Sequence, residues 1–144
     1  MIYTPLTHKA LLTAYQAHLG QTDRSGLPYI FHPFHLAEQM DDEDSTAAAL
    51  LHDVVEDTSL TLEDLAQAGF PPEVLEVVDL LTHDPAVSYM DYIQRIVHSQ
   101  NPIAQKIKLA DLKHNSDLSR LDTISPKDQE RLQKYRQAIQ MLTQ

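Results

Sequence analysis

One imidazole and three carboxylates follow an apolar run in the segment 47–58. The stretch of alanines, leucines and valines that would otherwise be buried is closed by His52, Asp53, Glu56 and Asp57. Burying so much negative charge costs free energy unless a cation or another partner compensates for it. The residue types and their spacing therefore indicate the chemistry of a metal centre.

The spacing of these four residues suits one face of a helix. At about 100° per residue, their side chains fall within roughly 140° of one another. His52 lies one turn before Glu56. Asp53 lies one turn before Asp57, so the members of each pair can touch. In the alternative interpretation the three acids are the solvated end of an amphipathic helix, which is the commoner arrangement for acidic residues taken singly. This segment alone leaves both interpretations open.

A second cluster has helical spacing within residues 108–115. Lys108, Asp111 and Asn115 stand at positions i, i+3 and i+7, and they share one face of a predicted helix within about 60°. The acid could supply a metal ligand between two contacts to phosphate or base. An exposed stripe with a salt bridge between Lys108 and Asp111 is the alternative.

A third candidate is His32, which precedes Pro33 at the predicted start of a helix. The residue before a proline has restricted backbone geometry, so the imidazole can be aimed at a fixed point. A histidine in such a place is also commonly structural or exposed. The candidate site thus draws on three separate segments of the chain.

The elements that position these residues are predicted to be helices. Apolar residues recur at helical spacing almost throughout. The chain has only three glycines and lacks a run of alternating β-branched residues, and both features argue against a sheet. We expect an all-α fold, a single domain over residues 1–144 that is built from about eight helices. The predicted helices cover 8–19, 33–40, 45–57 with Asp44 or Ser45 as N-cap, 62–69 after Thr61, 72–81, 88–98, 102–115 after Asn101, and a last helix from Pro126 after Ser125.

Composition excludes several classes of function. The formal net charge of −10 argues against general binding to nucleic acid or to anionic membranes, although a small phosphorylated ligand is compatible with it. Because the chain has no cysteine, a metal site must consist of histidine and carboxylate ligands. The N-terminal segment carries His8, Lys9 and Tyr15 and lacks a continuous apolar core, so we expect neither a signal peptide nor a membrane span there. We expect a cytoplasmic protein.

The three segments together resemble the HD-domain phosphohydrolases, and within them the hydrolase module of the RelA/SpoT family and its small stand-alone alarmone hydrolases. The matching motifs are Gly26-x-Pro28-Tyr29-Ile30-x-His32-Pro33, Ala48-Ala49-Leu50-Leu51-His52-Asp53-x-x-Glu56-Asp57-Thr58 and Lys108-x-Ala110-Asp111-x-x-His114-Asn115. They occur in the family's order with compatible spacing, and the resemblance extends from about Leu6 to Leu118. The implied fold is a single-domain HD-type helical bundle. Long family members add a synthetase domain for which this sequence shows no counterpart, so only hydrolysis is implied.

The resemblance implies a role for each candidate residue. The ligands of one divalent metal ion, by family analogy Mn²⁺, would be His32, His52, Asp53 and Asp111. Two imidazoles and two carboxylates also suit Fe²⁺ or Zn²⁺. The catalytic pair, which handles a water whose pKa the metal lowers, would be Glu56 and Asp57. Contacts to the nucleotide substrate or its phosphates would come from Arg24, Lys108 and Asn115.

The implied function is that of a metal-dependent phosphoric ester hydrolase that removes pyrophosphate from the 3′ position of guanosine tetraphosphate or pentaphosphate. Two departures from the family pattern concern the substrate. Asp23 precedes Arg24 where the family commonly has an Arg-Lys pair, and Leu112 follows Asp111 where an arginine is common. Because arginine stacks on bases and grips phosphates, these departures point to a difference in guanine selection or diphosphate binding.

Two alternative functions stay open. One is the same metal chemistry on another nucleotide or on a phosphorylated cofactor. The other is a non-catalytic nucleotide-sensing module that keeps the metal pocket. The pair Glu56 and Asp57 argues against the second, because a binding module has less use for carboxylates beyond the metal ligands.

Other polar residues are predicted to have supporting or surface roles. His114 would orient a neighbour or cap a helix end, and His35 would lie on the helix surface or behind the ligands. No motif surrounds His8, His18, His83 or His98. The last helix would be a solvated face or the contact of a homo-oligomer, since acids and amides separate its cations Lys127, Arg131, Lys134 and Arg136.

Overall fold

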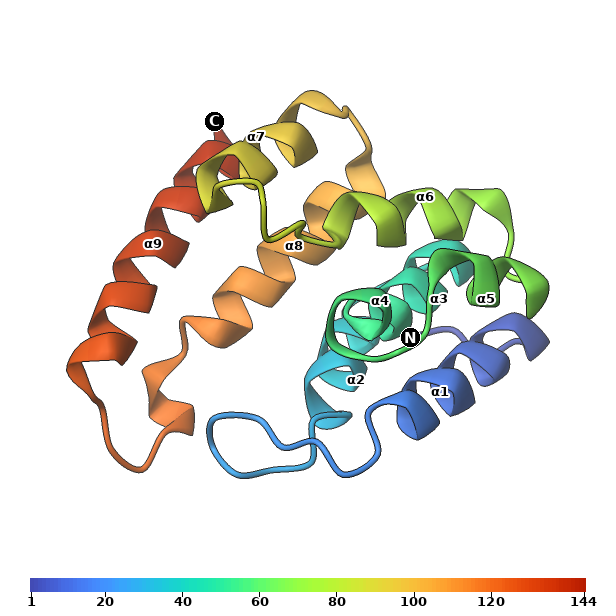
Figure 1. The fold of residues 1–144 in the computed structure, drawn as a ribbon, viewed down its shortest axis with the longest axis horizontal. Coiled ribbons are helices and arrows are strands. Elements are labelled where there is room, and N and C mark those ends of the chain that lie inside the picture. Colours follow the sequence, from blue (N-terminus) through green and yellow to red (C-terminus); the bar gives the residue numbers. More distant parts are fainter.

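The computed structural model describes residues 1–144 as nine α-helices and one 3₁₀ helix (Figure 1). The α-helices are α1 (Pro5–Ala17), α2 (Phe31–Glu38), α3 (Glu43–Leu51), α4 (Val54–Asp57), α5 (Leu62–Gln67), α6 (Pro72–Leu81), α7 (Tyr89–His98), α8 (Pro102–Asn115) and α9 (Pro126–Thr143). The 3₁₀ helix η1 (Leu118–Arg120) lies between α8 and α9. The only β-type contact is an isolated antiparallel bridge between Thr22 and Pro28, so the predicted all-α fold is confirmed. None of the helices combines the length and apolar character needed to cross a membrane.

The predicted helix that carries the first cluster is divided in two. α3 ends at Leu51 and α4 begins at Val54, so the expected continuous helix over 45–57 is wrong. Asp53 has φ −105° and ψ 0°, outside the range of a regular helix. The break lets the carboxylate of Asp53 approach the ring of its neighbour His52, whereas consecutive side chains on a regular helix point about 100° apart. The division also explains why nine helices are present where about eight were expected.

Several helix starts follow the signals in the sequence. Thr61 and Ser125 form the capping boxes of α5 and α9. The N-cap of α3 is Asp42, however, and not Asp44 or Ser45. Its carboxylate accepts a hydrogen bond of 2.8 Å from the backbone N–H of Ser45, because an N-cap side chain reaches the N–H two or three residues further on.

Two helices begin earlier than predicted. α2 begins at Phe31 instead of Pro33, and α1 begins at Pro5, where Thr4 forms a capping box. Pro33 is compatible with the first turn of α2 because N–H groups there need no carbonyl partner within the helix. His32 therefore belongs to the first turn of a helix, where it is only 2% exposed.

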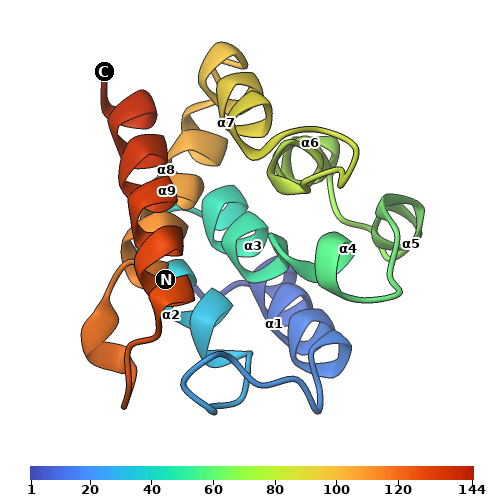
Figure 2. The same ribbon diagram turned by 60° about the vertical axis from the view of Figure 1, so that its left-hand side comes forward.

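The central helix of the bundle is α3. It packs against α1, α2, α6 and α8, and Figure 2 shows it near the middle of the molecule. Every residue from Ser45 to Leu51 is buried, and the three consecutive alanines 47–49 allow close approach of the neighbouring helices. α9 packs on α7 and α8 at the outside of the bundle (Figure 1). The C-terminal end of α3 thus carries His52 into the interior beside α2 and α8.

Candidate active site

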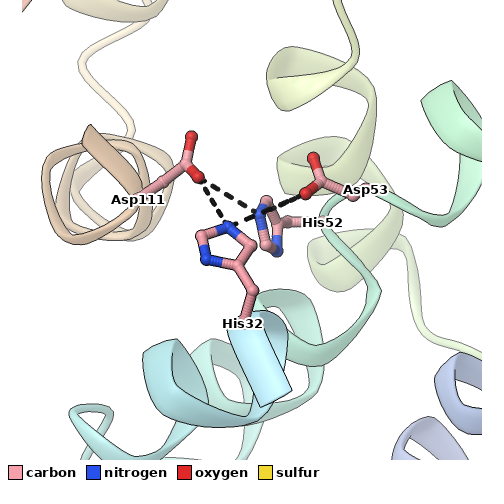
Figure 3. Close-up of side chains that lie close together, drawn as sticks. All are labelled: His32, His52, Asp53 and Asp111. Carbon is pink, nitrogen blue, oxygen red and sulfur yellow. Dashed lines mark hydrogen bonds and ion pairs between the residues drawn. The ribbon is translucent and has the colours of Figure 1, made fainter. Parts of the chain in front are cut away.

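The four predicted metal ligands meet at one point, although they come from three parts of the fold (Figure 3). His32 projects from the first turn of α2, and Asp111 projects from α8. His52 and Asp53 occupy the break between α3 and α4. The ligand atoms of the four side chains lie within 4.8 Å of one another. His32 Nε2 is 2.8 Å from Asp111 Oδ1, and the structure brings together every residue that was predicted to hold the ion.

The hydrogen bonding of His52 fits this cluster to a cation. Its Nδ1 lies 2.7 Å from the backbone oxygen of Ala49, so Nδ1 carries a proton and donates it to that oxygen. The buried Nε2 makes no hydrogen bond within the protein, and it faces Asp53 Oδ2 at 2.9 Å and Asp111 Oδ1 at 3.8 Å. A lone pair that faces two carboxylates is repelled until a proton or a metal ion lies between them. Two imidazoles and two carboxylates are suitable ligands for a divalent ion such as Mn²⁺, Fe²⁺ or Zn²⁺.

The pKa values in the cluster reflect the same attraction for positive charge. Burial lowers the pKa of His52, but the carboxylates of Asp53 and Asp111 hold that pKa well above its usual range. Burial raises the pKa of Asp53, yet the charge of His52 lowers it to about 2. Burial also acts to raise the pKa of Asp111, but Lys108 and His32 hold it well below its usual range. Both carboxylates are therefore ionised at neutral pH.

Two of the predicted substrate contacts, Lys108 and Asn115, bind Asp111. Lys108 Nζ lies 2.8 Å from Asp111 Oδ2, and Asn115 Nδ2 donates to Oδ1 at 3.0 Å. The Lys108 side chain is 12% exposed, so this is a buried ion pair and not the exposed stripe that was the alternative. Although burial lowers the pKa of Lys108, Asp111 holds it well above its usual range. The two residues hold the carboxylate of Asp111 in place, and they also line the cavity beside it.

Two further side chains orient the ligands. Tyr29 donates its hydroxyl to Asp53 Oδ2 at 2.5 Å. His114 Nδ1 lies 2.7 Å from Nδ1 of His32, so the expectation that His114 orients a neighbour is confirmed. Tyr29 received no role from the sequence, although its place in the Gly-x-Pro-Tyr-Ile motif was a usable signal.

Glu56 and Asp57 lie beside the ligand cluster. Together with Asp53 they form a second group of acids whose oxygens lie within 4.8 Å of one another. The backbone N–H of His83 donates to Glu56 Oε1 at 2.6 Å, and the side-chain amide of Gln21 donates to the carbonyl oxygen of Asp57 at 2.9 Å. Burial and the charge of Asp53 raise the pKa of both carboxyls. A carboxylate with a raised pKa is a better proton acceptor.

Two neighbouring cavities flank the cluster, with volumes of about 270 and 240 Å³. Tyr29, Asn115 and Tyr135 line both, so one extended ligand could reach from one cavity into the other. The larger cavity contains the carboxylates Glu56 and Asp57. Enzyme sites are commonly clefts of roughly 300–1,000 Å³, and the two cavities together are of this size.

The arginines of the smaller cavity are engaged in ion pairs. Arg24, a predicted substrate contact, is paired with Asp128 of α9. Arg120 was not predicted; its Nη2 lies 3.2 Å from Oδ2 of Asp23. Of the two departures from the family pattern, Asp23 is therefore held in an ion pair at the cavity, while Leu112 is 1% exposed and belongs to the core. No spacing in the sequence links Arg120 to the candidate site.

Comparisons with known proteins agree with this geometry. A family model described as HD domain matches residues 10–141. The bifunctional (p)ppGpp synthase/hydrolase SpoT of Escherichia coli (strain K12) is 38% identical over 120 residues, which cover 74% of this chain and 17% of that protein. A probable guanosine-3′,5′-bis(diphosphate) 3′-pyrophosphohydrolase of Synechocystis is 32% identical over 140 residues, which cover 86% of this chain and 18% of the relative. The chain thus spans less than a fifth of the length of these curated relatives.

A solved structure is similar over the whole chain. It belongs to a metazoan ortholog of SpoT that, according to its description, hydrolyzes ppGpp and plays a role in starvation responses. The TM-score is 0.79 at 25% sequence identity, and the match covers 99% of this chain and 88% of the other.

Proposed function

This chain belongs to the HD domain family, and on that premise we propose that it is a metal-dependent hydrolase that removes pyrophosphate from the 3′ position of guanosine tetraphosphate or pentaphosphate. The observation that carries the proposal is the convergence of two imidazoles and two carboxylates beside a second group of acids. The activities named for the relatives support this choice of substrate.

The metal site is proposed to consist of four ligands and to take Mn²⁺. The ligands are His32, His52, Asp53 and Asp111. When bound, a divalent ion supplies Lewis-acid chemistry that lowers the pKa of a water molecule and offsets the charge of a phosphate. Tyr29 and Lys108 hold the carboxylates of this set in place through their contacts with Asp53 and Asp111.

Glu56 and Asp57 are proposed to act on the attacking water. The carboxylate of Glu56 is oriented by the backbone N–H of His83, and burial makes both acids better proton acceptors. One carboxylate accepts the proton while the water oxygen forms a bond to the phosphorus attached to the ribose. The bond between that phosphorus and the 3′ oxygen breaks, the 3′ oxygen takes up the proton that the carboxylate accepted, and pyrophosphate is released.

Substrate binding is proposed to involve Arg24, Lys108 and Asn115. Asn115 lines both cavities, so its side chain is placed to contact the substrate where the nucleoside joins its phosphates. Lys108 lines the larger cavity and Arg24 the smaller one. This arrangement supports binding of the phosphates near the acids and of the nucleoside near the arginines.

A second candidate function is the same chemistry on another nucleotide or on a phosphorylated cofactor. The ion pair between Arg24 and Asp128 favours it, because an engaged guanidinium is less free to stack on guanine. The two functions differ in the base that is accepted and in the phosphate product that is released.

A panel of nucleotides with added Mn²⁺, scored for the phosphate product that is released, tests the proposal. Release of pyrophosphate from guanosine tetraphosphate, lost after treatment with a chelator and restored by Mn²⁺, is the expected result. Release of orthophosphate from other phosphoesters would favour the second candidate. Absence of any release from every compound would identify a nucleotide-sensing module.

A further inference from the structure

Lys134 differs from the other lysines and arginines that line the two cavities. Those are ion-paired: Lys108 with Asp111, Arg24 with Asp128, and Arg120 with Asp23. Lys134 of α9 lines the larger cavity and makes no ion pair. It is therefore the free positive charge of the site, and it lies in the same cavity as Glu56 and Asp57.

An aromatic side chain holds the ammonium of Lys134 at the cavity. Its Nζ lies 4.5 Å from the centre of the Tyr89 ring, and Nζ of Lys108 lies 5.8 Å from the same centre. The hydroxyl of Tyr89 is buried and makes no hydrogen bond within the protein. Burial raises the pKa of Tyr89 to about 12, so the hydroxyl keeps its proton and can donate it. Lys134, Lys108 and Tyr89 thus all line one cavity.

The position of the reacting phosphorus determines which phosphate of the substrate can reach Lys134, Tyr89 and Lys108. That phosphorus must lie at the ligand cluster, beside Asp53 and Asp111. Of the two neighbouring cavities, the smaller has arginines that are already paired with acids, and only the larger has an unpaired lysine. The phosphate beyond the reacting one therefore finds its positive partner in the larger cavity.

We propose that Lys134, with Tyr89 and Lys108 beside it, binds the distal phosphate of the diphosphate that the reaction releases. This proposal deepens the proposed function and rests on it to the extent that the released product is a diphosphate. Lys134 is exposed, as the sequence predicted, and the proposal adds a role in binding to that surface position. The same contact would distinguish a diphosphate from a single phosphate, because a single phosphate bound at the cluster has no distal phosphate to contact Lys134.

Calorimetry tests this assignment. It measures how inorganic pyrophosphate and orthophosphate bind to the Mn²⁺-loaded protein of 144 residues. Loss of a hydrogen bond to a charged group predicts that Lys134→Gln weakens pyrophosphate binding roughly tenfold and leaves orthophosphate binding unchanged. Lys134→Arg should restore most of the affinity. Arg136→Gln is the matched control, because it removes one charge from the same helix about 200° around its axis. Equal metal content in all variants verifies that the ligand cluster is intact.

Three results would overturn the proposal. The first is that Lys134→Gln binds pyrophosphate as tightly as the original protein. The second is that Arg136→Gln loses as much pyrophosphate affinity as Lys134→Gln. The third is that the original protein does not bind pyrophosphate. Because these measurements need no turnover, they are separable from the nucleotide panel. A protein that releases only orthophosphate in that panel would refute the proposed function, while the effect of Lys134→Gln on pyrophosphate would still be measured.

Discussion

His52 Nε2 and Asp53 Oδ2 lie 2.9 Å apart, although the two residues are neighbours in the chain. Neighbouring side chains on a regular helix diverge by about 100°. The short distance is possible because α3 ends at Leu51 and α4 begins only at Val54. The break between the two helices is what brings the side chains of two consecutive residues together.

Replacement of His52 by alanine should remove both metal binding and activity. The imidazole is buried and faces two carboxylates, which would repel each other around an incomplete site. We expect hydrolysis to fall by more than about 100-fold, the upper range for residues that only support metal ligands. Metal content measured by mass spectrometry checks the cause. His98→Ala, at an exposed histidine of α7, should retain metal and activity. Full metal content in His52→Ala would contradict the assignment.

Tyr29→Phe should weaken metal binding without disrupting the fold. It removes the hydrogen bond of 2.5 Å that orients the carboxylate of Asp53. Loss of such a supporting contact typically lowers metal affinity about 10- to 100-fold. Competition with a chelating dye measures the change. Tyr15→Phe, at a half-exposed tyrosine of α1, is the control and should leave the affinity for Mn²⁺ unchanged.

Glu56→Gln and Asp57→Asn should separate metal binding from turnover. Neither residue is among the four ligands, so both variants should bind Mn²⁺ as the original protein does. Loss of a proton-accepting group predicts a fall in kcat of roughly 10²- to 10⁴-fold. Glu63→Gln, at an exposed acid of α5, provides the matched control. If both site variants hydrolysed the substrate at the original rate, the role given to these carboxylates would be wrong.

The N-cap of α3 should contribute stability that depends on pH. Hydrogen bonds from the hydroxyl and the backbone N–H of Ser45 lower the pKa of Asp42 from the usual 3.8. A carboxyl with a lowered pKa stabilises the folded state above its unfolded pKa, and this contribution is lost as the pH falls through the folded pKa. Asp42→Ala should therefore lower the free energy of unfolding by about 1 kcal/mol at pH 7. The difference from the original protein should shrink below pH 3.8.

Thermal melts from neutral to acidic pH check this behaviour. Asp42→Asn is the informative control, because its carbonyl oxygen accepts the same hydrogen bonds but does not titrate. It should keep most of the stability at pH 7 and lack the loss at acidic pH. A constant difference between Asp42→Ala and the original protein across the whole range would contradict the linkage.

Local signals account for what could be predicted from the sequence. The capping boxes at Thr61 and Ser125 each lie within four residues, and the ligand set is what the family resemblance of three short motifs implies. The break after Leu51 could not be predicted, because the apolar pattern over 45–57 is equally compatible with one continuous helix. The structure places this break at the end of α3, a helix that packs against four neighbours.

Contacts between distant segments account for what the sequence did not reveal. Arg120 and Asp23 are 97 residues apart in the chain, and no spacing rule joins them. Lys134 resembles any exposed cation on a polar helix. Only the packing of α9 on α8 brings it to the cavity. For the same reason the shared face of Lys108 and Asp111 was predictable, while its burial was not.

The contact between His32 and Asp111 joins residues that are 79 positions apart. A metal ion shared by these two side chains would act as a crosslink that closes a long loop and ties α8 to α2. Unlike a disulfide, this crosslink can be withdrawn by a chelator, and its strength rises with the concentration of free metal. The supply of metal would then control how firmly the C-terminal helices are held to the rest of the bundle. This effect would be independent of the role of the metal ion in hydrolysis.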